Sequence, residues 1–233
     1  MPTIVFASSK GGVGKTTSAL ALSFVFVQAG ATTTVVDADP NAPLTRWADR
    51  FPDSIPAGLR VVAGVGNSAA RVIDEAASRD PFVVVDLEGT KNVDVSVGLG
   101  RADLALIPMQ GSQLDADEAA TVVQLIRTQE EVFRREIPFR VFFTRTSPVI
   151  ASKGMRDIHA QLKEFEIPML RTSFMEREAF RAPFRVGASL YDLTSRDVRN
   201  PQAAIDNAEA FAAEIRDILT RATTTAQNPI GAH

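Results

Sequence analysis

Short apolar runs rich in β-branched residues alternate along the chain with longer segments whose apolar residues recur at helical spacing. Continuous apolar runs of this kind are typical of strands buried on both faces of a parallel sheet. The predicted strands are residues 3–7, 33–36, 59–62, 82–85, 103–108, 139–144 and 169–172. The predicted helices are residues 16–29, 44–50, 68–79, 114–135, 152–165 and 203–221. This alternation predicts a doubly wound α/β fold, with a mostly parallel sheet, right-handed crossovers and helices on both faces.

The size and composition of the chain favour one large domain. Its 233 residues suffice for a single α/β domain with a sizeable core but would be cramped for two. We expect this domain to span residues 1–222 and to be followed by a flexible tail at residues 223–233. The absence of cysteine excludes disulfides, thiolate metal sites and cysteine nucleophiles. No targeting signal precedes the first predicted strand and no apolar run approaches the length of a membrane span, so we expect a cytoplasmic protein.

Charge is unevenly distributed along the sequence. The net charge is −3, but residues 127–199 carry +4, whereas residues 1–126 carry −5 and residues 200–233 carry −2. A basic block can supply a phosphate-binding surface even on an acidic chain, although a mildly basic stretch is more often a solvated face. The last predicted helix is acidic on balance, so an anionic membrane would repel it, and we expect no membrane partner.

A glycine-rich loop joins the first predicted strand to the first predicted helix. Gly11, Gly12 and Gly14 allow the backbone to curl so that successive N–H groups point inward and surround phosphate oxygens. Lys15 supplies a positive charge for the outer phosphates, and Thr16 places a hydroxyl where such loops hold Mg²⁺. The following helix points the positive end of its dipole at the same anion. These residues predict binding of a nucleoside triphosphate with Mg²⁺; the alternative is a glycine-rich turn with a solvated lysine.

Three aspartates follow predicted strands at the edge where open α/β sheets bind their ligands. Asp37 and Asp39 follow the second strand, and Asp86 ends the apolar run VVVD, which resembles a Walker B motif. We predict that Asp37 and Asp86 help to hold Mg²⁺, Asp86 through a bound water. The alternative for Asp37 and Asp39 is a turn and capping role ahead of Pro40. Glu88 adds a carboxylate near the outer phosphate, where it either assists hydrolysis or lies in a solvated loop.

The segment KGGVGKTT at residues 10–17 resembles the deviant Walker A box of the ParA/MinD family of ATPases. The resemblance implies that ATP is the nucleotide and that the whole loop binds it. The loop residues concerned are Gly11, Gly12, Val13, Gly14, Lys15, Thr16 and Thr17. It also implies that Lys10 reaches across a dimer interface to the partner's phosphates, so that Lys10 and Lys15 both serve catalysis. By the same resemblance, Asp39 lies in a DxDP box and helps to position the attacking water.

Later segments resemble the ParA side of this family. Residues 106–115 resemble its LIPxxPSxxD segment, and residues 143–145 resemble a strand end near the adenine pocket. Arg145, at that strand end, either stacks on the base or faces solvent. Residues 172–193 resemble the C-terminal pattern of small partition proteins and related virulence ATPases of DNA transfer. Because the chain begins at the P-loop strand, we expect no N-terminal helix-turn-helix domain and no operator-specific repression.

The resemblance implies a ParA-type ATPase that forms a homodimer on binding ATP·Mg²⁺, binds nonspecific double-stranded DNA and drives partition of plasmid or chromosomal DNA. Hydrolysis would be weak without a ParB-like adaptor that binds the centromere or cargo, and the ATP-bound protein would associate with the nucleoid. The candidate DNA contacts, for which a solvated face is the alternative, are Arg177, Arg181, Arg185, Arg196 and Arg199. Two other functions remain open: a MinD-like or cargo-positioning ATPase that acts without DNA, and a metabolic amide- or cyclo-ligase of the same fold.

Overall fold

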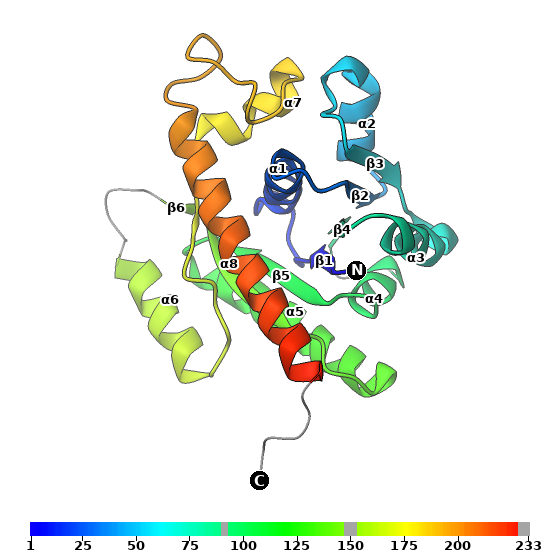
Figure 1. Cartoon of the computed structure of the whole chain (residues 1–233). Helices are drawn as coiled ribbons and strands as arrows, with labels where there is room; N and C mark the ends of the chain where they lie inside the picture. Colours follow the sequence, from blue (N-terminus) through cyan, green and yellow to red (C-terminus); the bar gives the residue numbers. More distant parts are fainter. Residues whose placement is uncertain (90–92, 147–152, 228–233) are drawn as a thin grey trace.

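The computed structural model describes residues 1–89, 93–146 and 153–227, and in these residues a parallel sheet forms the centre of the molecule (Figure 1). Its strands are β1 (Thr3–Phe6), β2 (Thr33–Ala38), β3 (Leu59–Ala63), β4 (Phe82–Leu87), β5 (Leu104–Met109), β6 (Phe139–Thr146) and β7 (Phe174–Met175). They are arranged in the order β3-β2-β4-β1-β5-β6-β7, and every pairing is parallel. The strand that leads into the glycine-rich loop, β1, therefore lies at the middle of the sheet.

Helices cover both faces of this sheet, as the alternating pattern predicts (Figure 1). In the described residues they are α1 (Lys15–Gln28), α2 (Pro43–Arg50), α3 (Ala69–Arg79), α4 (Val93–Leu99), α5 (Gln113–Phe133), α6 (Lys153–Glu164), α7 (Ala182–Val186) and α8 (Gln202–Gln227). Short 3-10 turns lie in three of the connections between strands and helices, at Pro52–Ser54, Gly66–Ser68 and Glu178–Phe180. None of the described helices is long and apolar enough to cross a membrane.

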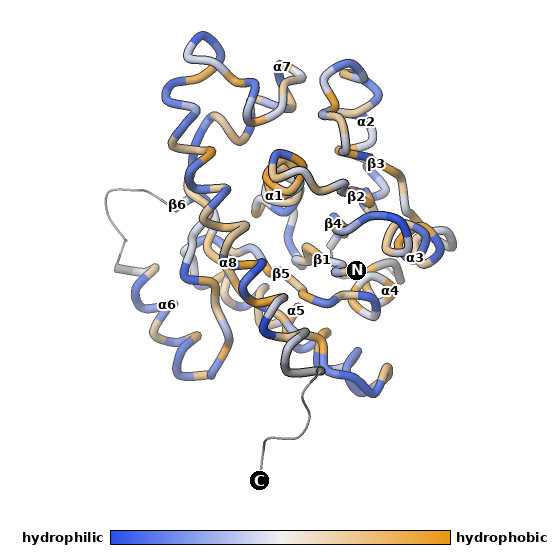
Figure 2. Tube along the Cα trace, viewed as in Figure 1, coloured by the Kyte–Doolittle hydropathy of each residue, from blue (hydrophilic) through white to orange (hydrophobic). Residues whose placement is uncertain are grey.

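The two faces of the sheet support separate hydrophobic cores because successive side chains of a strand point to opposite faces. Ile4 and Phe6 of β1 pack with residues of α1, α2 and α8, whereas Val5, between them, packs with residues of α3, α4, α5 and α6. Helix α1 is apolar along most of its length and packs between the sheet and α8 (Figure 2). This burial on all sides explains why the sequence of α1 has almost no polar face.

The last predicted strand, residues 169–172, is wrong. Met169 forms only an isolated bridge with Val141, and the strand that pairs with β6 is β7, further along the chain. Glu214 on α8 explains the shift, because its carboxylate accepts hydrogen bonds from the backbone N–H groups of Arg171 and Thr172, at 2.8 and 2.9 Å. In a strand, these N–H groups would donate to backbone carbonyls of the neighbouring strand, so residues 171 and 172 cannot extend the pairing with β6.

The C-terminal end of the chain and one helix also differ from the prediction. Helix α8 continues to Gln227, beyond the predicted end at residue 221, so residues 223–227 of the expected tail are helical. Residues 228–233 of that tail, and the predicted first residue of the helix at 152–165, lie outside the described residues. Helix α4 was not predicted at all. Its Gly98 lies against Leu87, and a Cβ added there would come within 2.8 Å of the leucine side chain.

Candidate nucleotide site

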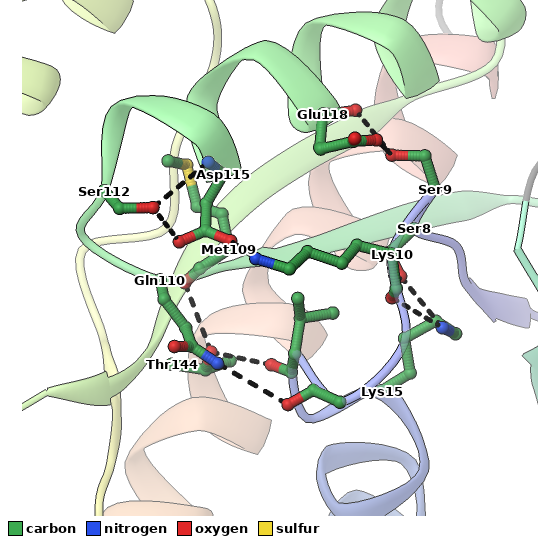
Figure 3. Close-up of polar contacts among 12 residues, drawn as sticks. Ser8, Ser9, Lys10, Lys15, Met109, Gln110, Ser112, Asp115, Glu118 and Thr144 are labelled. Atoms are coloured by element: carbon green, nitrogen blue, oxygen red, sulfur yellow. Dashed lines mark hydrogen bonds and ion pairs between the residues drawn. The ribbon is translucent and has the colours of Figure 1, made fainter.

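The glycine-rich loop between β1 and α1 has the conformation that its sequence predicts. Gly12 and Gly14 have φ angles of +75° and +101°, which residues with a Cβ adopt only at a cost in strain. The loop is also held from the side by β6, because the Thr144 hydroxyl donates a hydrogen bond to the Val13 carbonyl at 2.7 Å. The Gln110 amide reaches the Gly12 carbonyl at 3.5 Å (Figure 3). The loop is thus curled by its glycines and held in place by side chains of β6 and of the segment after β5.

Lys15 folds back over this loop. Its ammonium donates to the Ser8 hydroxyl at 2.8 Å and to the Lys10 carbonyl at 3.5 Å (Figure 3). The side chain is buried, and burial lowers the pKa of Lys15, although Asp86, Asp39 and Glu88 oppose this shift by their negative charge. Among the described residues its direct partners are these two neutral oxygens, of Ser8 and Lys10, and a buried cation in such a setting is well suited to receive phosphate oxygens.

Asp86 lies at the end of β4, beside Asp37 on β2 and Phe6 on β1. Its Oδ2 atom accepts a hydrogen bond from the Thr16 hydroxyl at 2.6 Å, whereas its buried Oδ1 atom has no hydrogen-bond partner in the part of the chain described. Burial is the main reason why the pKa of Asp86 is raised to about 7. A carboxylate oxygen left unsatisfied next to the Thr16 hydroxyl fits a cation or its bound water.

The donor set fits Mg²⁺ better than a metal held by protein alone. In the described residues no group of three or more His, Cys, Asp or Glu side chains could hold a metal ion. Mg²⁺ is usually bound by one or two protein ligands together with substrate phosphates and water. Thr16 and Asp86 could supply that protein share. The geometry of Thr16 and Asp86 therefore suits the predicted role of both residues in holding Mg²⁺.

Asp37 accepts hydrogen bonds from the first turn of α2, and Asp39 accepts them from the turn that precedes this helix. The Asp37 Oδ2 atom accepts from the backbone N–H groups of Leu44 and Thr45 at 2.9 and 2.8 Å. Burial raises the pKa of Asp37 in spite of these bonds. Asp39 Oδ1 accepts from the backbone and side-chain nitrogens of Asn41 at 2.8 and 2.9 Å. These contacts match the turn and capping alternative, and the metal role of Asp37 and the catalytic role of Asp39 stay predictions.

Side chains from the first two turns of α5 contact Ser9 and Lys10, in the first half of the loop. The Lys10 ammonium lies 3.0 Å from Asp115 Oδ1, and the Ser9 hydroxyl bonds to the Glu118 carboxylate (Figure 3). Asp115 is 4% exposed and also accepts from the Ser112 hydroxyl. Burial alone would raise the pKa of Asp115, but the hydrogen bonds from Ser112 and Lys10 outweigh it and lower the pKa.

The sequence analysis noted Asp115 as the last residue of the segment that resembles LIPxxPSxxD, but it gave α5 no role in the site, although the helix carries a further signal. Asp115 and Glu118 are three residues apart, a spacing that puts two side chains on the same side of a helix. Both face the loop. The Lys10 side chain points toward α5, where its ammonium contacts Asp115. The Lys15 side chain points in another direction, back across the loop to Ser8 (Figure 3).

Arg145 lies on β6, and thus on the other side of β1 from the aspartates of β2 and β4. It has a φ angle of +53°, its side chain is 45% exposed, and its Nε atom lies 3.7 Å from Glu176. It lines a hollow together with Gly14 and Thr17 of the loop region. The structure thus places Arg145 beside the phosphate loop, where either of its predicted roles is open.

The arginines predicted to contact DNA lie between β7 and α8, at one end of the molecule (Figure 1). Arg181 pairs with Glu176, and Arg185 lies 3.4 Å from Glu178 and 3.1 Å from the Asp197 carbonyl. Arg196 and Arg199 are exposed, whereas Arg177 is partly buried. Two of the five arginines are therefore paired with glutamates of the same segment, and one is turned inward.

Comparisons with known proteins agree with the fold and identify the family of this chain. The model of the CobQ/CobB/MinD/ParA nucleotide-binding domain matches residues 4–187. The chain is 39% identical over 223 residues to the protein ParA of Rhizobium radiobacter, covering 95% of this chain and 99% of that protein. It is 26% identical to the maintenance of carboxysome distribution protein A of Halothiobacillus neapolitanus, covering 83% and 88%. The solved MinD cell division protein of Aquifex aeolicus has a TM-score of 0.67 at 17% identity, covering 91% and 98%.

These matches confirm the predicted doubly wound fold and the predicted family. The match to the family model covers most of the chain, and the ParA relative matches nearly its whole length. The chain belongs to the ParA/MinD family of nucleotide-binding ATPases.

Proposed function

We propose that this protein is a ParA-type partition ATPase that dimerises on binding ATP·Mg²⁺, binds nonspecific double-stranded DNA and is released by adaptor-stimulated hydrolysis. Its similarity to a protein named ParA over nearly the whole of both chains supports this assignment. A ParB-like adaptor bound to the DNA cargo would stimulate the hydrolysis. The ATP-bound form would be found with the nucleoid in the cytoplasm.

One observation carries the proposal: the chain holds a lysine that its own phosphate loop does not use. Lys15 begins α1, is buried and folds its side chain back over the loop, whereas the Lys10 side chain points away from the loop, is 41% exposed and contacts Asp115. A second, reachable cation at the mouth of a phosphate site is what a nucleotide shared between two chains requires. In a symmetric dimer each Lys10 would bind the phosphates held by the partner subunit, so that ATP links the two chains.

The loop would hold ATP by its backbone N–H groups and by Lys15, with Mg²⁺ held by Thr16 and Asp86. Bound Mg²⁺ would neutralise phosphate charge. Lys15 gives up its contact with the Ser8 hydroxyl to meet the outer phosphates, and Asp39, which is partly exposed, orients the water that attacks. Hydrolysis would remove the outer phosphate that both chains share, and the dimer would loosen.

DNA would bind across the end of the dimer that carries the exposed arginines. Dimerisation doubles the number of arginine side chains facing one duplex, which raises the affinity without any new kind of contact. Arg181 and Arg185 would exchange their glutamate partners for phosphates. Because such binding releases counterions, it should weaken steeply as salt is added.

A second candidate is a positioning ATPase for a protein cargo. The similarity to a carboxysome distribution protein supports it, since that relative matches 83% of this chain. The nucleotide cycle would be the same, and only the surface to which the dimer binds would differ.

The test is binding to a long duplex of arbitrary sequence with ATP·Mg²⁺, with ADP·Mg²⁺ and without nucleotide, at low and moderate salt. We expect binding only with ATP, weakened by salt. Binding that ignores the nucleotide would contradict the switch. No binding to DNA in any state, with ATP-dependent dimerisation intact, would favour the protein-cargo function.

A further inference from the structure

A hollow beside the phosphate loop is lined by basic side chains. Gly14, Thr17 and Ser18 form one wall, and Arg145 at the end of β6 forms another. The segment around β7 closes it with Arg177 and Arg181. The hollow thus lies against the loop and the first turn of α1.

The strand order shows which part of a nucleotide would reach this hollow. Asp37 and Asp86 lie near the ends of β2 and β4, on one side of β1, whereas the hollow is lined by the ends of β6 and β7, on the other side. The two threonines after Lys15 point to these two sides. Thr16 bonds to Asp86, whereas Thr17 lines the hollow. If the outer phosphates and Mg²⁺ lie on the Asp86 side, the nucleoside extends toward the hollow.

Arg177 is the basic residue of this hollow whose hydrogen bonds are incomplete. Its Nε atom is buried and has no hydrogen-bond partner among the described residues, and its Nη2 atom contacts only the weak acceptor sulfur of Met175, at 3.5 Å. Arg145 and Arg181 both pair with Glu176. A buried donor without an acceptor costs free energy unless a ligand satisfies it. Its partial burial also keeps Arg177 from reaching a duplex as freely as Arg196 or Arg199.

We propose that Arg177 is a nucleotide-binding residue that contacts the nucleoside part of ATP, and that it does not belong to the DNA-binding surface. Its guanidinium would donate to acceptor atoms of the ribose or base, and its planar face can stack on a purine. The inference rests on the proposed nucleotide site. It removes one arginine from the predicted DNA contacts and gives the hollow a function.

The test compares Mg·ATP with Mg·tripolyphosphate, which has the phosphates but no nucleoside. Calorimetry should show that Arg177→Ala weakens ATP binding roughly ten- to a hundredfold, the loss expected for a hydrogen bond from a charged group. Binding of tripolyphosphate should not change. Arg171→Ala is the matched control, because Arg171 lies in the same segment, is 85% exposed and pairs only loosely with Glu214. It should bind both ligands as the unmodified protein does.

Three results would overturn the proposal. Unchanged ATP affinity would show that Arg177 makes no contact, and an equal loss for both ligands would assign it to the phosphates. ATP binding that is retained while DNA binding is lost would return it to the DNA surface. If the unmodified protein binds no ATP, the nucleotide site itself fails, which is a separate result. Should the alanine variant unfold, Arg177→Met keeps an unbranched apolar stem and gives the same comparison.

Discussion

Asp115→Asn should make ATP-dependent dimerisation tighter, because it releases Lys10 from its contact with α5. In the free chain the Lys10 ammonium lies 3.0 Å from Asp115 Oδ1, and this contact must break before Lys10 can reach a partner's phosphates. Asparagine keeps an oxygen that can accept from the Ser112 hydroxyl, so the start of α5 should be preserved. The change therefore removes the charge of the pair and little else.

The size of the effect follows from the exposure of the two side chains. Exposed ion pairs contribute up to about 1 kcal/mol, and this pair lies at the upper end of that range because Lys10 is 41% exposed while Asp115 is 4% exposed. A symmetric dimer breaks two such pairs, one in each chain. The gain is then about 2 kcal/mol, or roughly thirtyfold in the dimer dissociation constant.

Sedimentation equilibrium with a non-hydrolysable ATP analogue would measure this constant. Asp117→Asn is the matched control, because Asp117 is exposed on the same helix and its carboxylate accepts a hydrogen bond only from the Gln113 amide among the described residues. Lys10→Ala should prevent dimerisation, and adding Asp115→Asn to Lys10→Ala should not restore it, since the two residues act through one contact. An Asp115→Asn dimer of normal or weaker stability would refute this reasoning and would mean that Asp115 positions Lys10 for its partner.

Three further substitutions test the phosphate and metal side of the site. Lys15→Ala should abolish ATP binding measured by calorimetry, because the buried cation at the outer phosphates is lost; tight binding would contradict the loop assignment. Asp39→Ala should bind ATP and dimerise but turn over slowly in a phosphate-release assay, and normal turnover would leave Asp39 with its turn contacts alone. Asp86→Asn should change the pH dependence of unfolding without nucleotide or Mg²⁺. The pKa of Asp86 is about 7 in the folded chain against 3.8 as its ordinary value, so the folded chain binds the proton more tightly and loses stability as pH rises from about 4 to 7. Removing the charge should recover up to about 4 kcal/mol above pH 7, and an unchanged pH profile in denaturant titrations would contradict the raised pKa of the buried Asp86.

The sequence was sufficient for features that depend on neighbouring residues. The strand, glycine loop and helix around Lys15 are set by local conformational preferences, and Gly12 and Gly14 adopt the left-handed angles expected of them. Asp37 and Asp86, near the ends of β2 and β4, meet at one sheet edge because parallel strands end together. The capping contacts of Asp37 were also weighed from sequence, since a turn ahead of Pro40 can use that carboxylate.

Features that depend on distant residues could not be read in this way. The position of β7 is decided by Glu214, which lies more than forty residues further along the chain and takes the N–H groups of Arg171 and Thr172. Helix α4 has Val93, Val95 and Val97 at alternating positions, which is a strand pattern, and its length of 7 residues gives no helical period to detect. These two cases are decided by tertiary contacts, which override the local signal.

The contacts around the phosphate loop also indicate where a nucleotide-dependent change would occur. Thr144 and Gln110 hold the loop carbonyls from one side, and Glu118 holds Ser9 from the other. A loop fixed in this way needs little rearrangement when phosphates bind, because its glycines already have the required angles. Lys10 is the exception. In the part of the chain that the structure describes, its ammonium is held by one ion pair, with Asp115, and Lys10 is 41% exposed, so the release of Lys10 costs little free energy compared with binding a shared nucleotide. We therefore expect the change between monomer and dimer to begin with the Lys10 side chain and not with the backbone of the loop.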